Sequence, residues 1–213
     1  MLRRLLPLLL LLAVLLPAAP AQAATPYRWT AKPIDAATAK RMHTSYRAGC
    51  PVPLRDLRYL TMTYVDFAGK PQTGEMVVHA DVARNVARAF GKLYAQHFPL
   101  RRMRLVDDFG GSDDRSMAAD NTSAFNCRKV SGTSSWSMHA YGRAVDISPV
   151  ENPYVFPSGK VEPPAGKPYA KRSPARKGMV TRGVVEAFKA EGWGWGGYFK
   201  NAKDWQHFSR NGK

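Results

Sequence analysis

Residues 57–98 restrict the possible folds more than any other stretch of the chain. LRYLTMTYVDF (57–67) alternates in polarity and is rich in Tyr, Thr and Leu, which predicts a β-strand. AGKPQTGE predicts a turn and MVVHA (76–80) a second strand, so together they form a hairpin. DVARNVARAFGKLYAQHF (81–98) has apolar residues at helical spacing, with Asp81 as N-cap and Pro99 as the stop.

The later elements are shorter and more irregular. MRLVDDF (103–109) predicts a strand and TRGVVEAFKAEG (181–192) an amphipathic helix. Between them, residues 152–177 are rich in Pro and Lys without periodicity and predict a long loop. Strands and helices are mixed without βαβ alternation, so the predicted fold class is α+β, a small antiparallel sheet with flanking helices.

Residues 1–23 have the features of a secretory signal. A positive MLRR is followed by about a dozen apolar residues, and Ala21-Gln22-Ala23 fits an A-x-A cleavage site. A retained membrane anchor is the alternative, but Pro17 and Pro20 break the helix at its end. No later run reaches membrane-spanning length, so we expect an exported protein without stable membrane insertion after cleavage.

The chain is strongly basic, with 32 Lys and Arg against 16 Asp and Glu, a net charge of +16. Removing the leader takes away Arg3 and Arg4 and lowers this charge by two. Such a charge attracts anionic partners. No nucleic-acid module is recognisable, so wall polymer or envelope is the favoured partner, and a generally basic proteome remains an equal explanation.

Cys50 and Cys127 complete the compositional picture. In an exported chain, two cysteines predict one disulfide. A zinc site with two cysteines is the alternative, but neither residue has a Cys or His neighbour at ligand spacing.

The chemistry of the chain centres on SMHAYGRAVD (137–146) and DWQHF (204–208). His139, Asp146 and His207 would supply three ligands of a catalytic zinc ion and leave a fourth position open for water. Asp204, three residues before His207, would accept the proton of that water.

Other residues around these ligands have less specific roles. Gly142 would let the chain bend between the first two ligands, and Ser137 would hydrogen-bond a ligand from outside. Asp113 and Asp114 lack the spacing of a calcium loop and are predicted to lie in a solvated turn.

The string S-x-H-x-x-G-x-A-x-D, followed at a distance by D-x-x-H-F, resembles the zinc metallopeptidases that include D-alanyl-D-alanine dipeptidases and carboxypeptidases and L-alanyl-D-glutamate endopeptidases. The resemblance implies an α+β fold with an antiparallel sheet behind one zinc ion per chain. It assigns His139, Asp146 and His207 as ligands and Asp204 as the base. Many D,D-dipeptidases carry Glu at the base position, so Asp204 is closer to the endopeptidase branch.

Members of this family also use an upstream arginine to hold the developing oxyanion. The usual Tyr-Arg-Ser is replaced here by DDFGGSDDRS, so two positions remain open. Arg128, expected at a strand end beside Cys127, is preferred, and Arg115 is the alternative. The expected division of the chain is a signal segment (1–23), an N-terminal part with the hairpin and helix (24–100), and the catalytic core (101–213).

The resulting hypothesis is an exported zinc peptidase that hydrolyses amide bonds in peptidoglycan stem peptides, in the periplasm or cell wall. The bond would be of the L-Ala-D-Glu or D-Ala-D-Ala type. A non-catalytic wall-binding module with the same fold is one alternative, although a binder has no need of Asp204. A peptidoglycan amidase is the other.

Overall fold

The computed structural model describes residues 25–213, and the predicted signal segment lies outside the described residues. The α-helices are α1 (Ala36–Arg41), α2 (Ala83–Ala95), α3 (Asp113–Ala118) and α4 (Arg182–Lys189). The 3₁₀-helices are η1 (Leu54–Asp56), η2 (Val106–Phe109), η3 (Met138–Tyr141), η4 (Pro164–Tyr169) and η5 (Gly196–Tyr198). The strands are β1 (Trp29–Pro33), β2 (Leu57–Val65), β3 (Pro71–His79), β4 (Arg102–Met103), β5 (Asn121–Thr122), β6 (Ala144–Asp146), β7 (Tyr154–Val155), β8 (Val161–Glu162), β9 (Gly194–Trp195), β10 (Lys203–Asp204) and β11 (His207–Ser209).

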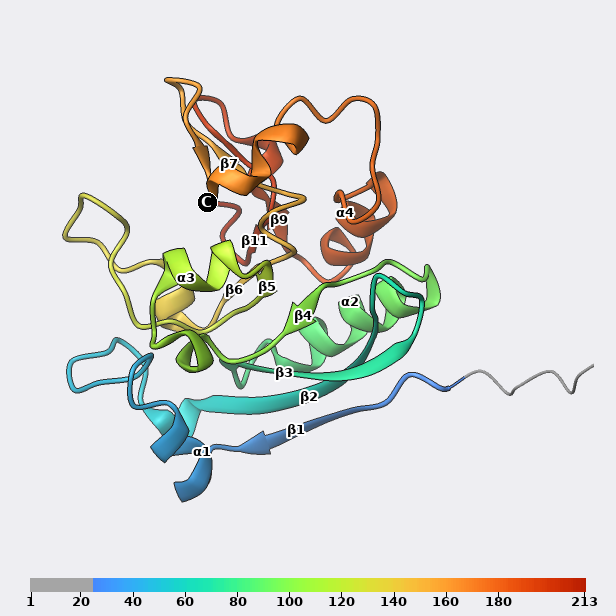
Figure 1. Cartoon of the computed structure of the whole chain (residues 1–213). Helices are drawn as coiled ribbons and strands as arrows, with labels where there is room; N and C mark the ends of the chain where they lie inside the picture. Colours follow the sequence, from blue (N-terminus) through green and yellow to red (C-terminus); the bar gives the residue numbers. More distant parts are fainter. Residues whose placement is uncertain (1–24) are drawn as a thin grey trace, which may run out of the picture.

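The predicted α+β class is confirmed. Three small antiparallel sheets have the strand orders β1-β2-β3, β10-β7-β8 and β6-β11-β9, and β4 pairs with β5 in parallel. In Figure 1 the long strands β1 to β3 form the lower part of the molecule, and β7, β9, β11 and α4 form the upper part. Among residues 25–213, no helix is long and apolar enough to cross a membrane.

The predicted hairpin is present, but its second strand begins earlier than expected. β3 starts at Pro71 and pairs with β2 along nine residues. The turn is short because the Asp66 carboxylate accepts hydrogen bonds from the backbone N–H groups of Ala68 (2.8 Å) and Lys70 (2.9 Å). Pro71 is tolerated there as the first residue of a strand.

α2 packs its apolar side on the hairpin and on α4. Residues of β2, β3, α2, α4, β6 and β11 share one buried apolar cluster. Phe188 of α4 connects its parts: it meets Phe90 edge-on at 5.9 Å between ring centroids and stacks on Phe208 at 4.2 Å. The strand that carries His207 is therefore anchored in the main core.

The predicted cap of α2 is wrong. The helix begins at Ala83 after Val82, which makes no side-chain capping bond. Asp81 instead pairs with Arg143, with 2.6 Å between Oδ2 and Nη2. This contact joins the start of α2 to the turn after η3. The Asp81 carboxylate therefore makes a tertiary contact and does not cap the helix.

A second apolar cluster lies on the other face of the hairpin and includes Leu57, Val77 and Phe125. The predicted disulfide between Cys50 and Cys127 is present at its edge, with 5.9 Å between the Cα atoms. It connects segments 77 residues apart. The N-terminal segment is thereby covalently attached to the irregular segment that precedes the predicted zinc ligands.

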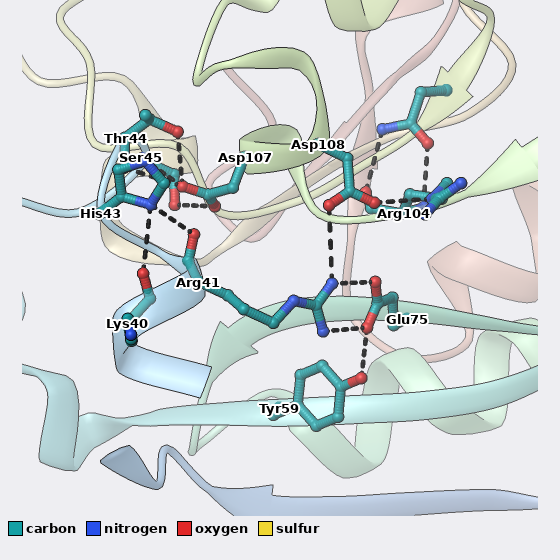
Figure 2. Close-up of polar contacts among 11 residues, drawn as sticks. Lys40, Arg41, His43, Thr44, Ser45, Tyr59, Glu75, Arg104, Asp107 and Asp108 are labelled. Carbon is teal, nitrogen blue, oxygen red and sulfur yellow. Dashed lines mark hydrogen bonds and ion pairs between the residues drawn. The ribbon is translucent and has the colours of Figure 1, made fainter. Parts of the chain in front are cut away.

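Polar side chains supplement this cluster where α1 meets the hairpin (Figure 2). Arg41 donates to both oxygens of Glu75, which also accepts a hydrogen bond from the Tyr59 hydroxyl. Arg41 further lies 3.7 Å from Asp108 of η2. The network fixes η2 above the sheet.

The strand predicted over residues 103–109 ends after Met103 and continues as η2. The Asn121 side chain accepts from the Arg104 N–H (2.9 Å) and donates to the Arg104 carbonyl (3.0 Å), which takes the place of further strand pairing. The predicted loop 152–177 also contains regular structure, namely β7, β8 and η4. β7 is ordered by pairing with both β8 and β10.

Candidate metal centre

Three buried side chains from separate elements converge on the C-terminal sheet. His139 lies in η3, Asp146 ends β6 and His207 begins β11. The antiparallel pairing of β6 with β11 places Asp146 directly opposite His207, so both side chains leave the same face of the sheet. A short turn after η3 brings His139 to the same point.

The potential ligand atoms lie close together. His139 Nε2 is 3.1 Å from Asp146 Oδ2, and His207 Nδ1 is 3.0 Å from Asp146 Oδ1. The two ring nitrogens are 3.3 Å apart. His139, Asp146 and His207 could therefore hold a metal ion, since one ligand atom of each lies within 4.8 Å of the others.

The outward nitrogens of both imidazoles contact backbone carbonyls. His139 Nδ1 lies 2.6 Å from the Ala124 carbonyl oxygen, and His207 Nε2 lies 3.3 Å from that of Lys213. An N–H donated to each carbonyl leaves a lone pair on His139 Nε2 and on His207 Nδ1, the two atoms that face Asp146. This is the usual way in which a protein fixes the tautomer of a metal-binding histidine.

The turn between the first two ligands depends on Gly142. Its φ is +64°, and a Cβ there would lie 2.6 Å from the backbone nitrogen of His79. Glycine is required both for the left-handed conformation and for this close approach to β3. Ser137 caps η3, and its hydroxyl accepts from the His139 backbone N–H at 3.3 Å, so its contact is with the backbone of the ligand residue and not with the ring.

The electrostatics of the cluster match a site for a cation. Burial raises the pKa of Asp146, but His139 and His207 outweigh it and hold that pKa well below its ordinary range. Burial lowers the pKa of His207, yet Asp146 and Asp204 together raise it to about 9. A carboxylate that stays charged inside the protein needs a positive partner, and two imidazoles with one carboxylate are a donor set that suits zinc.

Asp204 lies beside this cluster, at the end of β10. β10 pairs with β7, with Asp204 opposite Tyr154, and a two-residue bend then leads to His207. Gly196 makes room for this arrangement: a Cβ there would be 2.8 Å from the Cβ of Asp204 and 3.2 Å from that of His207. The absence of a side chain at position 196 brings the carboxylate and the imidazole together.

The surroundings of the Asp204 carboxyl raise its pKa above the ordinary value. Burial raises the pKa of Asp204 to about 7; the histidines lower it, and the charges of Asp146 and Asp113 add to the increase. Its Oδ1 is buried and has no hydrogen-bond partner in residues 25–213. An unpaired buried carboxyl oxygen is costly unless a ligand or water completes it.

The two candidate arginines have different surroundings. Arg115 donates from Nε to the Phe109 carbonyl (2.8 Å) and from Nη2 to that of Gly110 (3.3 Å), so it closes its own turn. Arg128 does not end a strand as predicted. Its segment is irregular between the bridges at Ser123 and Lys129, and it is fixed by the neighbouring disulfide.

Arg128 pairs with Asp113, a residue that the sequence predicted to lie in a solvated turn. Its Nη2 lies 2.7 Å from Oδ2 of Asp113, the first residue of α3. Burial raises the pKa of Asp113, and the charge of Asp146 adds to the increase, while Arg128 and His139 lower it. Asp113 therefore belongs to the electrostatic surroundings of the site, and the predicted solvated turn is wrong for it. No sequence signal separates it from the exposed Asp114 beside it.

The comparison with known families agrees with this geometry. A family model described as D-alanyl-D-alanine carboxypeptidase matches residues 131–210, which include His139, Asp146, Asp204 and His207. The resemblance that the two motifs carry is thus confirmed over this stretch. Arg128 and Asp113 lie before the matched residues. No curated protein sequence and no solved structure matches the chain significantly.

Proposed function

We propose that the chain is an exported zinc peptidase that hydrolyses amide bonds in peptidoglycan stem peptides. The convergence of His139, Asp146 and His207, with the unpaired carboxyl of Asp204 beside them, is the observation that carries the proposal. A wall-binding module would have no use for a buried carboxyl whose pKa is raised to about 7. The peptidase family match over residues 131–210 supports the same reaction class.

His139, Asp146 and His207 would hold one zinc ion per chain. When bound, zinc acidifies water and polarises a carbonyl group. Asp204 accepts a proton from the attacking water at its carboxylate and then donates that proton to the nitrogen of the leaving amine. Arg128 donates N–H groups to the carbonyl oxygen as negative charge develops on it.

The substrate class follows from the family and from the charge of the chain. Amide bonds of the L-Ala-D-Glu or D-Ala-D-Ala type are the candidates. The excess of Lys and Arg over Asp and Glu favours binding to an anionic cell wall, and a leader over residues 1–23 with a disulfide fits the periplasm or the wall.

The test is mass spectrometry of purified peptidoglycan fragments after incubation with the mature chain. Zinc-loaded wild type should release a defined amino acid or peptide, whereas zinc-stripped protein should release none. Asp204→Asn keeps the side-chain size and should lower kcat by about 10²- to 10⁴-fold with zinc still bound. Asp66→Asn, in the hairpin turn, is the control and should retain full activity.

Other products would change the assignment. Whole stem peptides freed from the glycan would identify an amidase. An intact substrate with zinc-loaded wild type, together with sedimentation of the protein with cell walls, would favour the binding module.

A further inference from the structure

Asp113, which pairs with Arg128, is a charged residue beside the site that the proposed reaction leaves unused. The two side chains are each about a quarter exposed (27% and 29%), and 2.7 Å separates Asp113 Oδ2 from Arg128 Nη2. Arg128 Nε is buried without a hydrogen-bond partner among residues 25–213. Nη2 is thus occupied by Asp113, Nη1 donates to the Lys129 carbonyl at 3.4 Å, and only the N–H of Nε has no partner among the described residues.

Chain neighbours of both members of the pair, Cys127 and Gly111, contact the same short segment, Thr44–Ser45. On the arginine side, the Cys127 N–H donates to the Ser45 carbonyl at 2.9 Å. On the aspartate side, Gly111 packs so closely on Thr44 that a Cβ would lie 2.7 Å from its carbonyl oxygen. The positions of the two charged residues are therefore set by one common support.

This support is itself rigid (Figure 2). The Asp107 carboxylate accepts four hydrogen bonds, from the backbone N–H and the hydroxyl of both Thr44 and Ser45, at 2.6–3.0 Å. Asn126 adds a weaker contact from its side-chain amide to the Gly111 carbonyl at 3.4 Å. A surface ion pair of chance geometry would not need such a framework on both sides.

We propose that Asp113 is a positioning residue of the peptidase site: it holds the Nη2 edge of Arg128 and so fixes which N–H groups face the substrate carbonyl. The inference rests on the proposed function and on Arg128 as the oxyanion residue. Charge-assisted pairs of this kind are strong and directional. An error of about 1 Å in the placement of a stabilising group costs on the order of 100-fold in rate.

A double-mutant cycle tests this role. Asp113→Asn removes the charge at constant size and should lower kcat about 10- to 100-fold, with KM, zinc content and melting temperature nearly unchanged. In an Arg128→Ala background the same substitution should have no further effect. Asp114→Asn, the adjacent exposed acid of the same helix turn, should behave as wild type, and Asp113→Glu should restore part of the rate.

Equal losses from Asp113→Asn in both backgrounds would overturn the proposal, because Asp113 would then act independently of Arg128. An equal loss in Asp114→Asn would also overturn it, since the effect would be one of net charge.

A second measurement does not need activity. In protein labelled with ¹⁵N-arginine, the Arg128 Nη2–H signal, which reports the N–H group facing Asp113 and is assigned by its loss in Arg128→Lys, should be sharp and displaced in wild type. It should collapse to the free-arginine position in Asp113→Asn. An unchanged signal would refute the positioning role even with an active enzyme. If the signal differs between wild type and Asp113→Asn but the wild type cleaves no substrate, the ion pair is real and the proposed function is rejected.

Discussion

The hairpin and the sheet that carries the candidate metal centre are built by opposite means. β2 and β3 pair over nine residues each, and their buried side chains are nearly all apolar. β6 and β11 are three residues long, and the strands around them only two. Where a repeated backbone ladder is absent, single polar side chains must satisfy the backbone.

Asn152 illustrates the second means. It is fully buried, and its amide group donates to the carbonyls of Ile147, Ser148 and Gly178 at 3.0–3.1 Å. Its Oδ1 accepts from the Val180 N–H at 2.6 Å. One side chain thus ties the end of β6 to the segment before α4. The comparison teaches that the hairpin depends on many equivalent contacts, whereas the metal centre depends on a few irreplaceable ones.

Removal of the disulfide should have the largest effect on stability, because it connects the two kinds of structure. Cys50→Ala with Cys127→Ala should lower the free energy of unfolding by about 4 kcal/mol, from the entropy that a closed loop of this length removes from the unfolded chain. Urea denaturation of the double variant and of oxidised wild type measures the difference. A loss below about 1 kcal/mol would mean that other contacts already restrain residues 50–127.

Asn152→Ala should have the second largest effect. It should lower the free energy of unfolding by about 3 kcal/mol, because several buried backbone groups would lose their hydrogen-bond partners. The same denaturation experiment applies, and zinc affinity should fall as well because Ile147 and Ser148 directly follow Asp146. Thr73→Ala, on an exposed part of the hairpin, is the control and should change stability by no more than about 0.5 kcal/mol. Equal losses at both positions would contradict the comparison.

The smallest effect concerns a buried carboxyl next to Asn152. Burial, together with Asp120, raises the pKa of Glu151 to about 8, above its ordinary value of 4.5. The folded state therefore holds the proton more tightly, and Glu151 costs stability as the pH rises from 4.5 to 8. The stability advantage of Glu151→Gln over wild type, measured as the free energy of unfolding in urea, should therefore grow by about 1 to 2 kcal/mol between pH 5 and pH 8. A difference that does not change with pH would show that Glu151 is charged throughout.

The regular elements were predictable from the sequence because their signals are repeated. Alternating polarity predicted β2, and apolar residues at helical spacing predicted α2 and α4, because in each element many residues follow the same pattern. The strand predicted over residues 103–109 was wrong because the chain turns into η2 through contacts with Asn121, Thr44 and Ser45, which lie outside that stretch. The start of β3 was missed because Pro71 and its neighbours also suit a turn.

The metal centre was predictable for a different reason, and only in part. His139, Asp146 and His207 stand in two motifs whose spacing is distinctive, and the structure brings all three together. Their roles, with that of Asp204, remain proposals. Asp113 carries no such motif. Its place depends on the packing of Gly111, two residues earlier, against Thr44 and on the pair with Arg128, contacts between segments that no sequence pattern connects.

The pairing of β7 with β10 has a consequence for how such a protein could diversify. Asp204 lies opposite Tyr154, and Tyr154 opens the Pro- and Lys-rich stretch that runs to residue 177. The carboxyl thus lies on a strand paired with that stretch, whereas Asp146 and His207 lie on a sheet bound to the main core and His139 lies in η3 just before it. Insertions in that stretch would move Asp204 and the adjoining wall of the site together and leave the ligands in place. Substrate range can then change by loop exchange without rebuilding the metal centre.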